Sequence, residues 1–420
     1  MTDAERITHN AQTKIGVRVK YAILVGDGMS DYPLAELGNK TPLEVAKIPN
    51  INEMVKRGAI GLVKTVPRGM KPASDVANLS ILGYDPKAYY TGRGPLEAAN
   101  IGVELAENEV AFRCNLVTVN SDIMADYSAG HISDKESKAL IECLNEKLGS
   151  DRLRFYHGKS YRNLLVIKTK SADELNDLTK ASCTPPHDIA SQDIRKNLPK
   201  GNGAELLNKL MEDSKAILDK HEINKVRLDL HENPANMIWL WGQGTNPNMP
   251  EFKGMFGIDG AVISAVDLVN GIGKIAGLEV VSVPGATGYY DTNYQGKGEY
   301  AVRVLKRKDF IFVHVESPDE AGHNGDLRAK ITAIENFDKF VVSAVWNFLK
   351  DTGDFRILVL SDHATPVSVR THVSDPAPFV MAGKSVEHNG FDMFSEANAA
   401  LSKLKFKSGA ALTEEFIKKV

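Results

Sequence analysis

The chain has 420 residues, which is enough for two or three domains and a large buried core. Its 51 basic and 54 acidic residues leave a formal charge of -3, which argues against nucleic acid and anionic membranes as partners. No apolar run approaches the ~18 residues that a membrane span needs, and the three cysteines, which lack metal or redox spacing, suit a reducing compartment. We expect a cytoplasmic protein, whose oligomeric state the composition leaves open.

The N-terminal segments alternate between strand-like and helix-like patterns. Residues 1–18 are polar and aperiodic, as in a loose arm, and the apolar run 21–25 predicts a strand that ends in Gly26-Asp27-Gly28. Helical spacing over 43–55 precedes a second predicted strand over 60–66.

The middle of the chain, from about Val110 to Pro250, has the pattern of an inserted domain. It contains its own predicted strands and helices, at 112–119, 133–148, 163–168 and 204–220. The acidic residues that end strands all lie outside it. We therefore predict one core made from residues 1–110 and 251–420, interrupted by a smaller α+β domain over 111–250.

The α/β rhythm returns after Phe252. The patterns predict a helix over 261–276, a long helix over 327–349, and strands over 280–283, 310–315 and 356–360. The strand over 310–315 is apolar and β-branched on both faces, which is typical of a buried parallel sheet. The predicted fold class is therefore α/β, with an open sheet in the core.

Three of the predicted strands end in acidic residues. Asp27 follows the first strand, Asp362 follows the strand over 356–360, and the turn after the strand over 310–315 bears Asp319. Ligands of open α/β sheets bind at the carboxyl ends of the strands. We therefore expect these distant parts of the sequence to meet in one crevice.

Three histidines accompany these acids: His323, four residues after Asp319, then His363 and His372. Each residue alone is more often a helix cap, a turn former or an ordinary histidine. Together, three carboxylates and three imidazoles can hold two divalent ions, and mixed oxygen and nitrogen ligands suit Mn²⁺ or Zn²⁺ better than Mg²⁺. Two such ions can assist an in-line displacement at phosphorus and activate a coordinated hydroxyl.

The best candidate for that hydroxyl is Ser74. It lies in a turn rich in Pro and Gly, just ahead of a short helix predicted from Val76 to Leu82. A serine in this place is often only a helix N-cap. The nearby metal pattern favours a nucleophile instead, because a helix start also offers free N–H groups to a phosphate.

Several long blocks of the chain resemble the archaeal-type cofactor-independent (2,3-bisphosphoglycerate-independent) phosphoglycerate mutases of the alkaline phosphatase superfamily. The blocks are LVGDGMSD, KPASDVANLSILGYDP, YYTGRGPLEAANIGVEL, HVESPDEAGHNGD and LSDHATPVSVRTH. The resemblance implies an alkaline-phosphatase-like core with the insert as a lid, and a phosphoserine intermediate on Ser74. One metal would be held by Asp319, His323 and His372, and the other by Asp27, Asp362, His363 and Ser74.

The resemblance also implies interconversion of 3-phosphoglycerate and 2-phosphoglycerate, as in glycolysis and gluconeogenesis, with Mn²⁺ as the expected ion and Zn²⁺, Co²⁺ or Mg²⁺ as alternatives. Substrate ligands are expected at Arg93, Arg162 and His131, since Arg suits bidentate capture of carboxylate and phosphate. The general acid/base is left open between His131 and an acid such as Asp126. The alternative function is a metal-dependent phosphatase or another phosphomutase on the same core.

Overall fold

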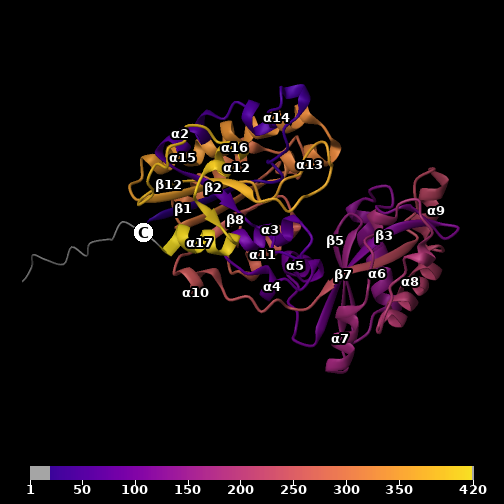
Figure 1. Cartoon of the computed structure of the whole chain (residues 1–420). Coiled ribbons are helices and arrows are strands. Elements are labelled where there is room, and N and C mark those ends of the chain that lie inside the picture. The colour runs from indigo at the N-terminus through magenta and orange to yellow at the C-terminus, as the bar shows by residue number, and fades with distance from the viewer. Residues whose placement is uncertain (1–18, 419–420) are drawn as a thin grey trace, which may run out of the picture.

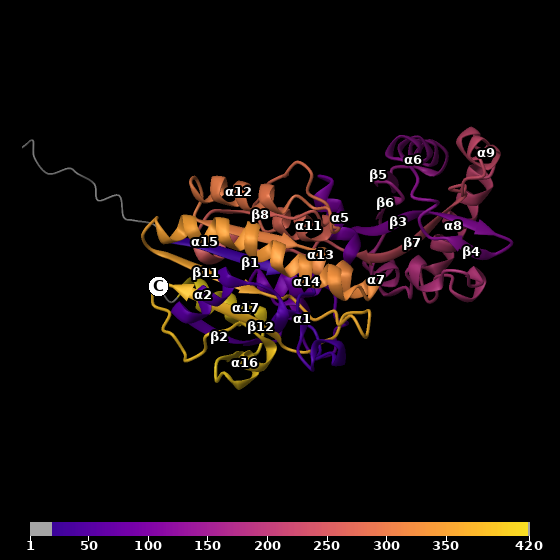
Figure 2. The same ribbon diagram turned by 90° about the horizontal axis from the view of Figure 1, so that it is seen from above.

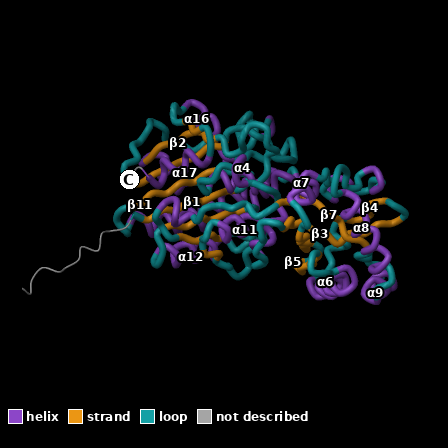
Figure 3. The backbone as a smooth tube through the Cα atoms, turned by 90° about the horizontal axis from the view of Figure 1, so that it is seen from below, coloured by secondary structure: helices purple, strands orange, loops and turns teal. Residues whose placement is uncertain are grey.

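The computed structural model describes residues 19–418, so the loose arm expected over 1–18 lies outside the described residues. Its strands form two separate groups (Figure 3). The larger group is an 8-stranded sheet with the order β13 (Lys405–Phe406), β2 (Gly58–Val63), β12 (Ala377–Gly383), β11 (Phe355–Leu360), β1 (Lys20–Gly26), β10 (Phe310–Val315), β8 (Gly260–Ile263) and β9 (Glu279–Val280). β12 runs antiparallel to β11 and β2, and the other neighbours are parallel.

Helices cover both faces of this sheet, which explains why its central strands are apolar throughout. Ala22 and Leu24 of β1 pack with one layer: α1 (Pro42–Val45), α2 (Pro49–Arg57), α12 (Tyr294–Leu305), α14 (Leu327–Asn336), α15 (Ser343–Lys350) and α16 (Glu396–Leu401). Ile23 and Val25 pack with the other: α3 (Ser74–Ile81), α10 (Phe252–Phe256), α11 (Asp267–Ile275) and α17 (Gly409–Lys418). The core is therefore a three-layer α/β/α structure built from both ends of the chain, as predicted.

The second sheet comes from the middle of the chain and lies apart from the first (Figures 1 and 2). Its strands are β3 (Glu109–Asn120), β4 (Ile123–Asp126), β5 (Leu153–Lys159), β6 (Arg162–Lys168) and β7 (Met237–Gly244), all paired antiparallel. Val110, Phe112, Cys114 and Leu116 of β3 pack into a second core, together with α6 (Asp134–Leu148), α7 (Ala172–Lys180) and α8 (Ala204–Leu218). α9 (Glu222–Asp229) follows α8.

α5 (Arg93–Asn100) joins the two bodies, and α4 (Pro86–Tyr89) precedes it. α5 packs on α11 of the core and on β3 and β7 of the second sheet. The chain passes between the core and the second sheet twice, near Thr91 and near Thr245. These two connecting segments touch beside α5, since Thr91 Oγ1 donates a hydrogen bond to the carbonyl of Thr245. Gly92 has a φ of 149° and lies against the carbonyl of Gln243, where a side chain would collide. The backbones of the two connecting segments therefore pack closely against each other.

Five predicted elements differ from the structure. The helix predicted over 43–55 is the two helices α1 and α2, and the long helix predicted over 327–349 has a π-helical segment, Phe337–Val342, between α14 and α15. The helix predicted over 261–276 is strand β8 followed by α11, because the run Gly260–Ile263 fits either period. The strand predicted over 280–283 is only the two-residue β9. The turn predicted to carry Asp319 and His323 is the helix α13 (Ser317–Asn324), which has Pro318 in its first turn and Gly325 as its C-cap. Helical spacing of four residues thus places Asp319 and His323 on one face.

A buried ammonium group ties the loops of the core together. Lys330 of α14 is fully buried, and its Nζ donates to Asp31 Oδ2 at 2.6 Å, to the Thr365 carbonyl at 2.8 Å and to the Ser30 carbonyl at 3.1 Å. The loop after β1 and the loop after β11 therefore share one cation, which satisfies all three of its donor hydrogens. Burial of a charge is tolerated here because its partners surround it.

We predict that Lys330→Met lowers the free energy of unfolding by about 3–5 kcal/mol, because it leaves the Asp31 carboxylate buried without its cation. The matched control is Lys209→Met, which breaks an exposed ion pair with Asp213 one helical turn away. That variant is expected to cost less than about 0.5 kcal/mol. Urea denaturation of the three proteins measures the difference, and equal losses in the two variants would contradict the role of Lys330.

Candidate metal centre and active site

The three acids predicted from strand ends meet at one edge of the large sheet. β1 lies between β10 and β11 and is parallel to both, so their carboxyl ends are neighbours. Asp27 follows β1, Asp362 follows β11, and Asp319 stands in the first turn of α13 after β10. All three side chains are buried.

One group of possible ligands is formed by Asp27, Asp362 and His363, whose ligand atoms lie within 4.8 Å of one another. His363 Nε2 is 3.5 Å from Asp27 Oδ1 and 3.6 Å from Asp362 Oδ2. The Ser74 hydroxyl oxygen lies 3.2 Å from the same nitrogen. A nitrogen, two carboxylates and a hydroxyl thus face a common point.

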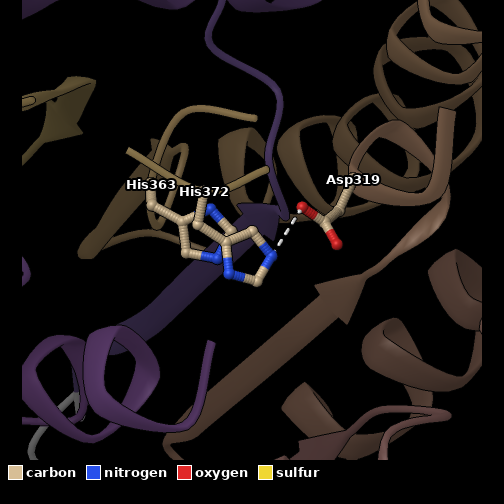
Figure 4. A group of neighbouring side chains, drawn as sticks. All are labelled: Asp319, His363 and His372. Atoms are coloured by element: carbon tan, nitrogen blue, oxygen red, sulfur yellow. Dashed lines mark ion pairs between the residues drawn. The ribbon is translucent and has the colours of Figure 1, made fainter. Parts of the chain in front are cut away.

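A second group of possible ligands contains Asp319, His372 and again His363 (Figure 4). His372 Nε2 is 3.3 Å from Asp319 Oδ1, and His323 Nε2 is 3.2 Å from Asp319 Oδ2. The Nε2 atoms of His323 and His372 are 2.8 Å apart. All seven predicted ligands, including Ser74, are therefore brought together, with His363 between the two groups.

The second ring nitrogen of each imidazole already has a partner. Nδ1 of His323 is 3.1 Å from the carbonyl of Arg370, and Nδ1 of His372 is 3.3 Å from the carbonyl of Pro72. Carbonyls only accept, so these Nδ1 atoms must carry the protons. Thr365 Oγ1 donates to Asp319, so it accepts from Nδ1 of His363 at 3.2 Å. When each imidazole is neutral, its Nε2 is therefore the lone-pair donor, which is the state that metal-binding histidines adopt.

The carboxylates also fit cations. Among the described residues, neither oxygen of Asp27 has a hydrogen-bond partner, although both are fully buried. Burial and the neighbouring carboxylates of Asp362 and Asp319 raise the pKa of Asp27 well above its ordinary value. Two unsatisfied oxygens beside two further acids are costly unless a positive charge joins them. We conclude that the residues present fit divalent metal ions.

Protons compete with cations at the second group. The hydrogen bond to Asp319 raises the pKa of the His323 imidazole to about 9. Burial alone would raise the pKa of Asp319, but hydrogen bonds from His323 and His372 outweigh it and hold that pKa well below its usual range. Metal binding at this group must therefore release a proton.

Ser74 is the first residue of α3, and the N-cap position is Ala73. No side chain caps this helix, so the interpretation of Ser74 as a plain N-cap is wrong. Asn78, one turn later, donates to the Ser74 carbonyl at 2.8 Å and to Asp362 Oδ2 at 2.9 Å. Asn78 thus ties the start of α3 to Asp362.

The three predicted substrate ligands lie outside this cluster. Arg93, at the start of α5, donates through Nε to Asp75 at 3.0 Å, so it is tied to the neighbour of Ser74. Arg162, at the start of β6, has a buried Nε without a hydrogen-bond partner among the described residues. His131 is exposed, has a φ of 50°, and its ring centre lies 6.0 Å from that of Tyr161. No hydrogen bond or ion pair within residues 19–418 joins these three residues to the seven ligands.

Sequence reasoning missed two kinds of supporting residue. His314 is buried inside β10 with its Nε2 2.9 Å from Asp27 Oδ2, and burial lowers the pKa of its imidazole to about 4. A single histidine within an apolar strand was the available signal. Thr365 links Asp319 to His363, but a threonine in a loop carries no signal of its own.

Comparisons with known proteins agree with this geometry. The family model described as 2,3-bisphosphoglycerate-independent phosphoglycerate mutase matches residues 55–224. The enzyme so named from Methanothermobacter thermautotrophicus, numbered 2 in that organism, is 51% identical over 381 residues, which are 90% of this chain and 92% of that protein. The Methanosarcina mazei enzyme is 51% identical over 364 residues, 86% of this chain and 90% of its own.

Two solved structures share the fold. A protein from Pyrococcus horikoshii superposes with a TM-score of 0.79 at 28% identity and covers 96% of this chain and 97% of its own. The cofactor-independent phosphoglycerate mutase from Thermoplasma acidophilum has a TM-score of 0.65 at 27% identity and covers 95% and 99%. The chain is 51% identical to the Methanothermobacter thermautotrophicus enzyme over 90% of its length. It therefore belongs to the family of 2,3-bisphosphoglycerate-independent phosphoglycerate mutases.

Proposed function

We propose that the chain interconverts 3-phosphoglycerate and 2-phosphoglycerate through a phosphoserine at Ser74. The observation that carries this proposal is the contact of the Ser74 hydroxyl with His363 at the convergence of three buried carboxylates. Ser74 Oγ forms a bond to phosphorus while the bond from phosphorus to the substrate oxygen breaks. The glycerate then presents its other hydroxyl, which attacks the phosphoserine and frees Ser74.

We propose two divalent cations, one with Asp27, Asp362, His363 and Ser74, and one with Asp319, His323 and His372. Bound there, the cations would lower the pKa of the serine hydroxyl and neutralise the phosphoryl charge. The mixture of imidazole and carboxylate favours Mn²⁺, with Zn²⁺, Co²⁺ or Mg²⁺ as alternatives. The sparse cysteines favour the cytoplasm as the compartment.

His131 is the better candidate for the proton transfer to and from the glycerate hydroxyls. Burial raises the pKa of Asp126, but hydrogen bonds from Ser128, Asn233 and Gly130 outweigh it and keep that pKa below its ordinary value. A carboxylate with so many donors is a poor proton acceptor. Asp126 instead orders the loop that presents His131, which is exposed and free to meet a substrate.

The second sheet is proposed as a lid, since a mutase must retain glycerate and exclude water from the phosphoserine. Arg162 supports this proposal, because a guanidinium with a buried, unpartnered Nε suits an anionic ligand. Arg93 is tied to Asp75 beside Ser74 and lies 5.7 Å from the ring centre of Trp241 of β7. It therefore connects the nucleophile helix with the lid.

Ser74→Ala is expected to abolish mutase activity while leaving the bound metals in place, because the phosphoryl acceptor is lost. The matched control is Ser80→Ala on the same helix, whose hydroxyl accepts from the backbone of Gly409 instead of facing His363. An enolase-coupled assay with 3-phosphoglycerate, together with metal analysis, measures both variants. Full activity in a metal-loaded Ser74→Ala protein would rule out the covalent route.

Removal of the metals is expected to abolish turnover, and refilling is expected to restore it at two ions per chain. Ions that bind only the folded state raise stability by about 2.7 kcal/mol at a hundredfold excess over Kd. Chelation, then titration with Mn²⁺, Zn²⁺, Co²⁺ or Mg²⁺, is followed by activity and by the thermal midpoint. Saturation at a single ion would contradict the two-ion assignment.

Arg162→Met is expected to raise KM for 3-phosphoglycerate by about tenfold to a hundredfold, since a hydrogen bond to a charged group contributes about 1.5–3 kcal/mol. The control is Arg195→Met, in the same part of the chain, whose guanidinium is exposed and pairs with Asp193. Steady-state kinetics of both variants give the comparison. Equal KM values in the two variants would contradict this role of Arg162.

A further inference from the structure

We propose that His314 is a positioning residue that aims Asp27 at its cation. The role rests on the proposed function, in that it presupposes a metal ion between Asp27, Asp362 and His363. It adds a residue that does not itself belong to the ligand set. The two oxygens of the Asp27 carboxylate face different imidazoles.

The strand register brings His314 to the end of β1. β10 pairs with β1 so that His314 lies opposite Val25, two residues before Asp27. The imidazole is completely buried, and its Nε2 lies 2.9 Å from Asp27 Oδ2. The other oxygen, Asp27 Oδ1, is the one that lies 3.5 Å from Nε2 of His363. One oxygen therefore faces the proposed ion and the other faces His314.

The proton of this imidazole belongs on Nε2. Two unprotonated acceptors buried 2.9 Å apart would repel each other, and Asp27 has no proton to offer once it is ionised to bind a cation. Neither atom has a hydrogen-bond partner among the described residues, although the two lie 2.9 Å apart. We infer that binding of the cation brings Asp27 into line with this donor.

Ser264 fixes the opposite end of the ring. Its Oγ accepts from the backbone N–H of Val266 at 3.0 Å and lies 3.3 Å from Nδ1 of His314. With that acceptor site filled, the serine proton is free to point at Nδ1. Lys297 adds a backbone anchor, since its buried Nζ donates to the His314 carbonyl at 3.1 Å. The ring is thus oriented from behind, with Nε2–H directed toward Asp27.

Proteins often orient a metal-binding side chain by a hydrogen bond from a neighbouring residue, and this contact raises the affinity for the metal. A donor on the outer oxygen of a ligating carboxylate limits its rotation and keeps the inner oxygen directed at the ion. Loss of such a partner typically weakens metal binding by about 10–100-fold. A histidine that only filled space would show no such effect, so the two roles predict different outcomes for an apolar and a polar replacement.

The test compares His314→Leu, which removes the donor, with His314→Gln, whose side-chain N–H₂ can replace Nε2–H. Metal-free proteins are titrated with Co²⁺, and affinity and electronic absorption are recorded for each ion. His314→Leu is expected to weaken one of the two ions by about 10–100-fold and to change its spectrum, while the other ion is unchanged. His314→Gln is expected to restore most of the affinity.

Ser264→Ala keeps the proposal testable if His314→Leu does not fold. It leaves β10 intact and is expected to weaken the same ion by a smaller factor. Wild-type affinity and spectrum in His314→Leu, or in Ser264→Ala when the leucine variant does not fold, would overturn the role of His314. So would equal losses in the Leu and Gln variants, which would indicate packing alone. If wild-type protein binds no pair of ions, the proposed function itself fails, which is a separate outcome.

Discussion

Three carboxylates buried at one edge of a sheet are the constraint on which this structure depends. Like charges in a region without water repel strongly, and each buried ion forfeits several kcal/mol of hydration. Asp27, Asp319 and Asp362 therefore need positive charge to coexist. In their neutral state the three imidazoles present lone pairs toward them, because their Nδ1 atoms are already engaged by Arg370, Pro72 and Thr365. The same constraint links the proposed cation binding, the release of protons and the proposed activation of Ser74, since each of them depends on the charge of this cluster.

Strand pairing and a single helical turn are enough to bring these groups together. Parallel pairing of β10, β1 and β11 brings two strand ends and one helix start together, and a single helical turn adds His323 to Asp319. Lys330 then holds the loops behind the site through Asp31 and the Thr365 carbonyl, and the hydroxyl of that threonine contacts Asp319. The acidic cluster thus has a cationic support behind it in the protein.

Much of the fold, and the convergence of the predicted ligands in one cluster, could be predicted because the signals are local. An apolar run followed by an acid indicates a buried strand that ends at a site, and the α/β class and the family are confirmed. The run Gly260–Ile263 could not be assigned, since four apolar residues fit a helix or a strand equally well. The proposed role of His314 could not be predicted, because it depends on which strand pairs with β10, and the sequence does not specify that pairing. The roles of Arg93, Arg162 and His131 remain predictions, as they depend on the substrate.

The hydrogen-bonded contact between Thr91 and Thr245 has an evolutionary consequence. The chain leaves the core and returns to it at nearly the same point. The inserted domain is therefore attached to the core at a single place. Such a domain can be exchanged, enlarged or reshaped without moving any strand that ends at the acidic cluster. Selection for a new phosphoester could therefore act on one body while the phosphoryl-transfer machinery stays as it is.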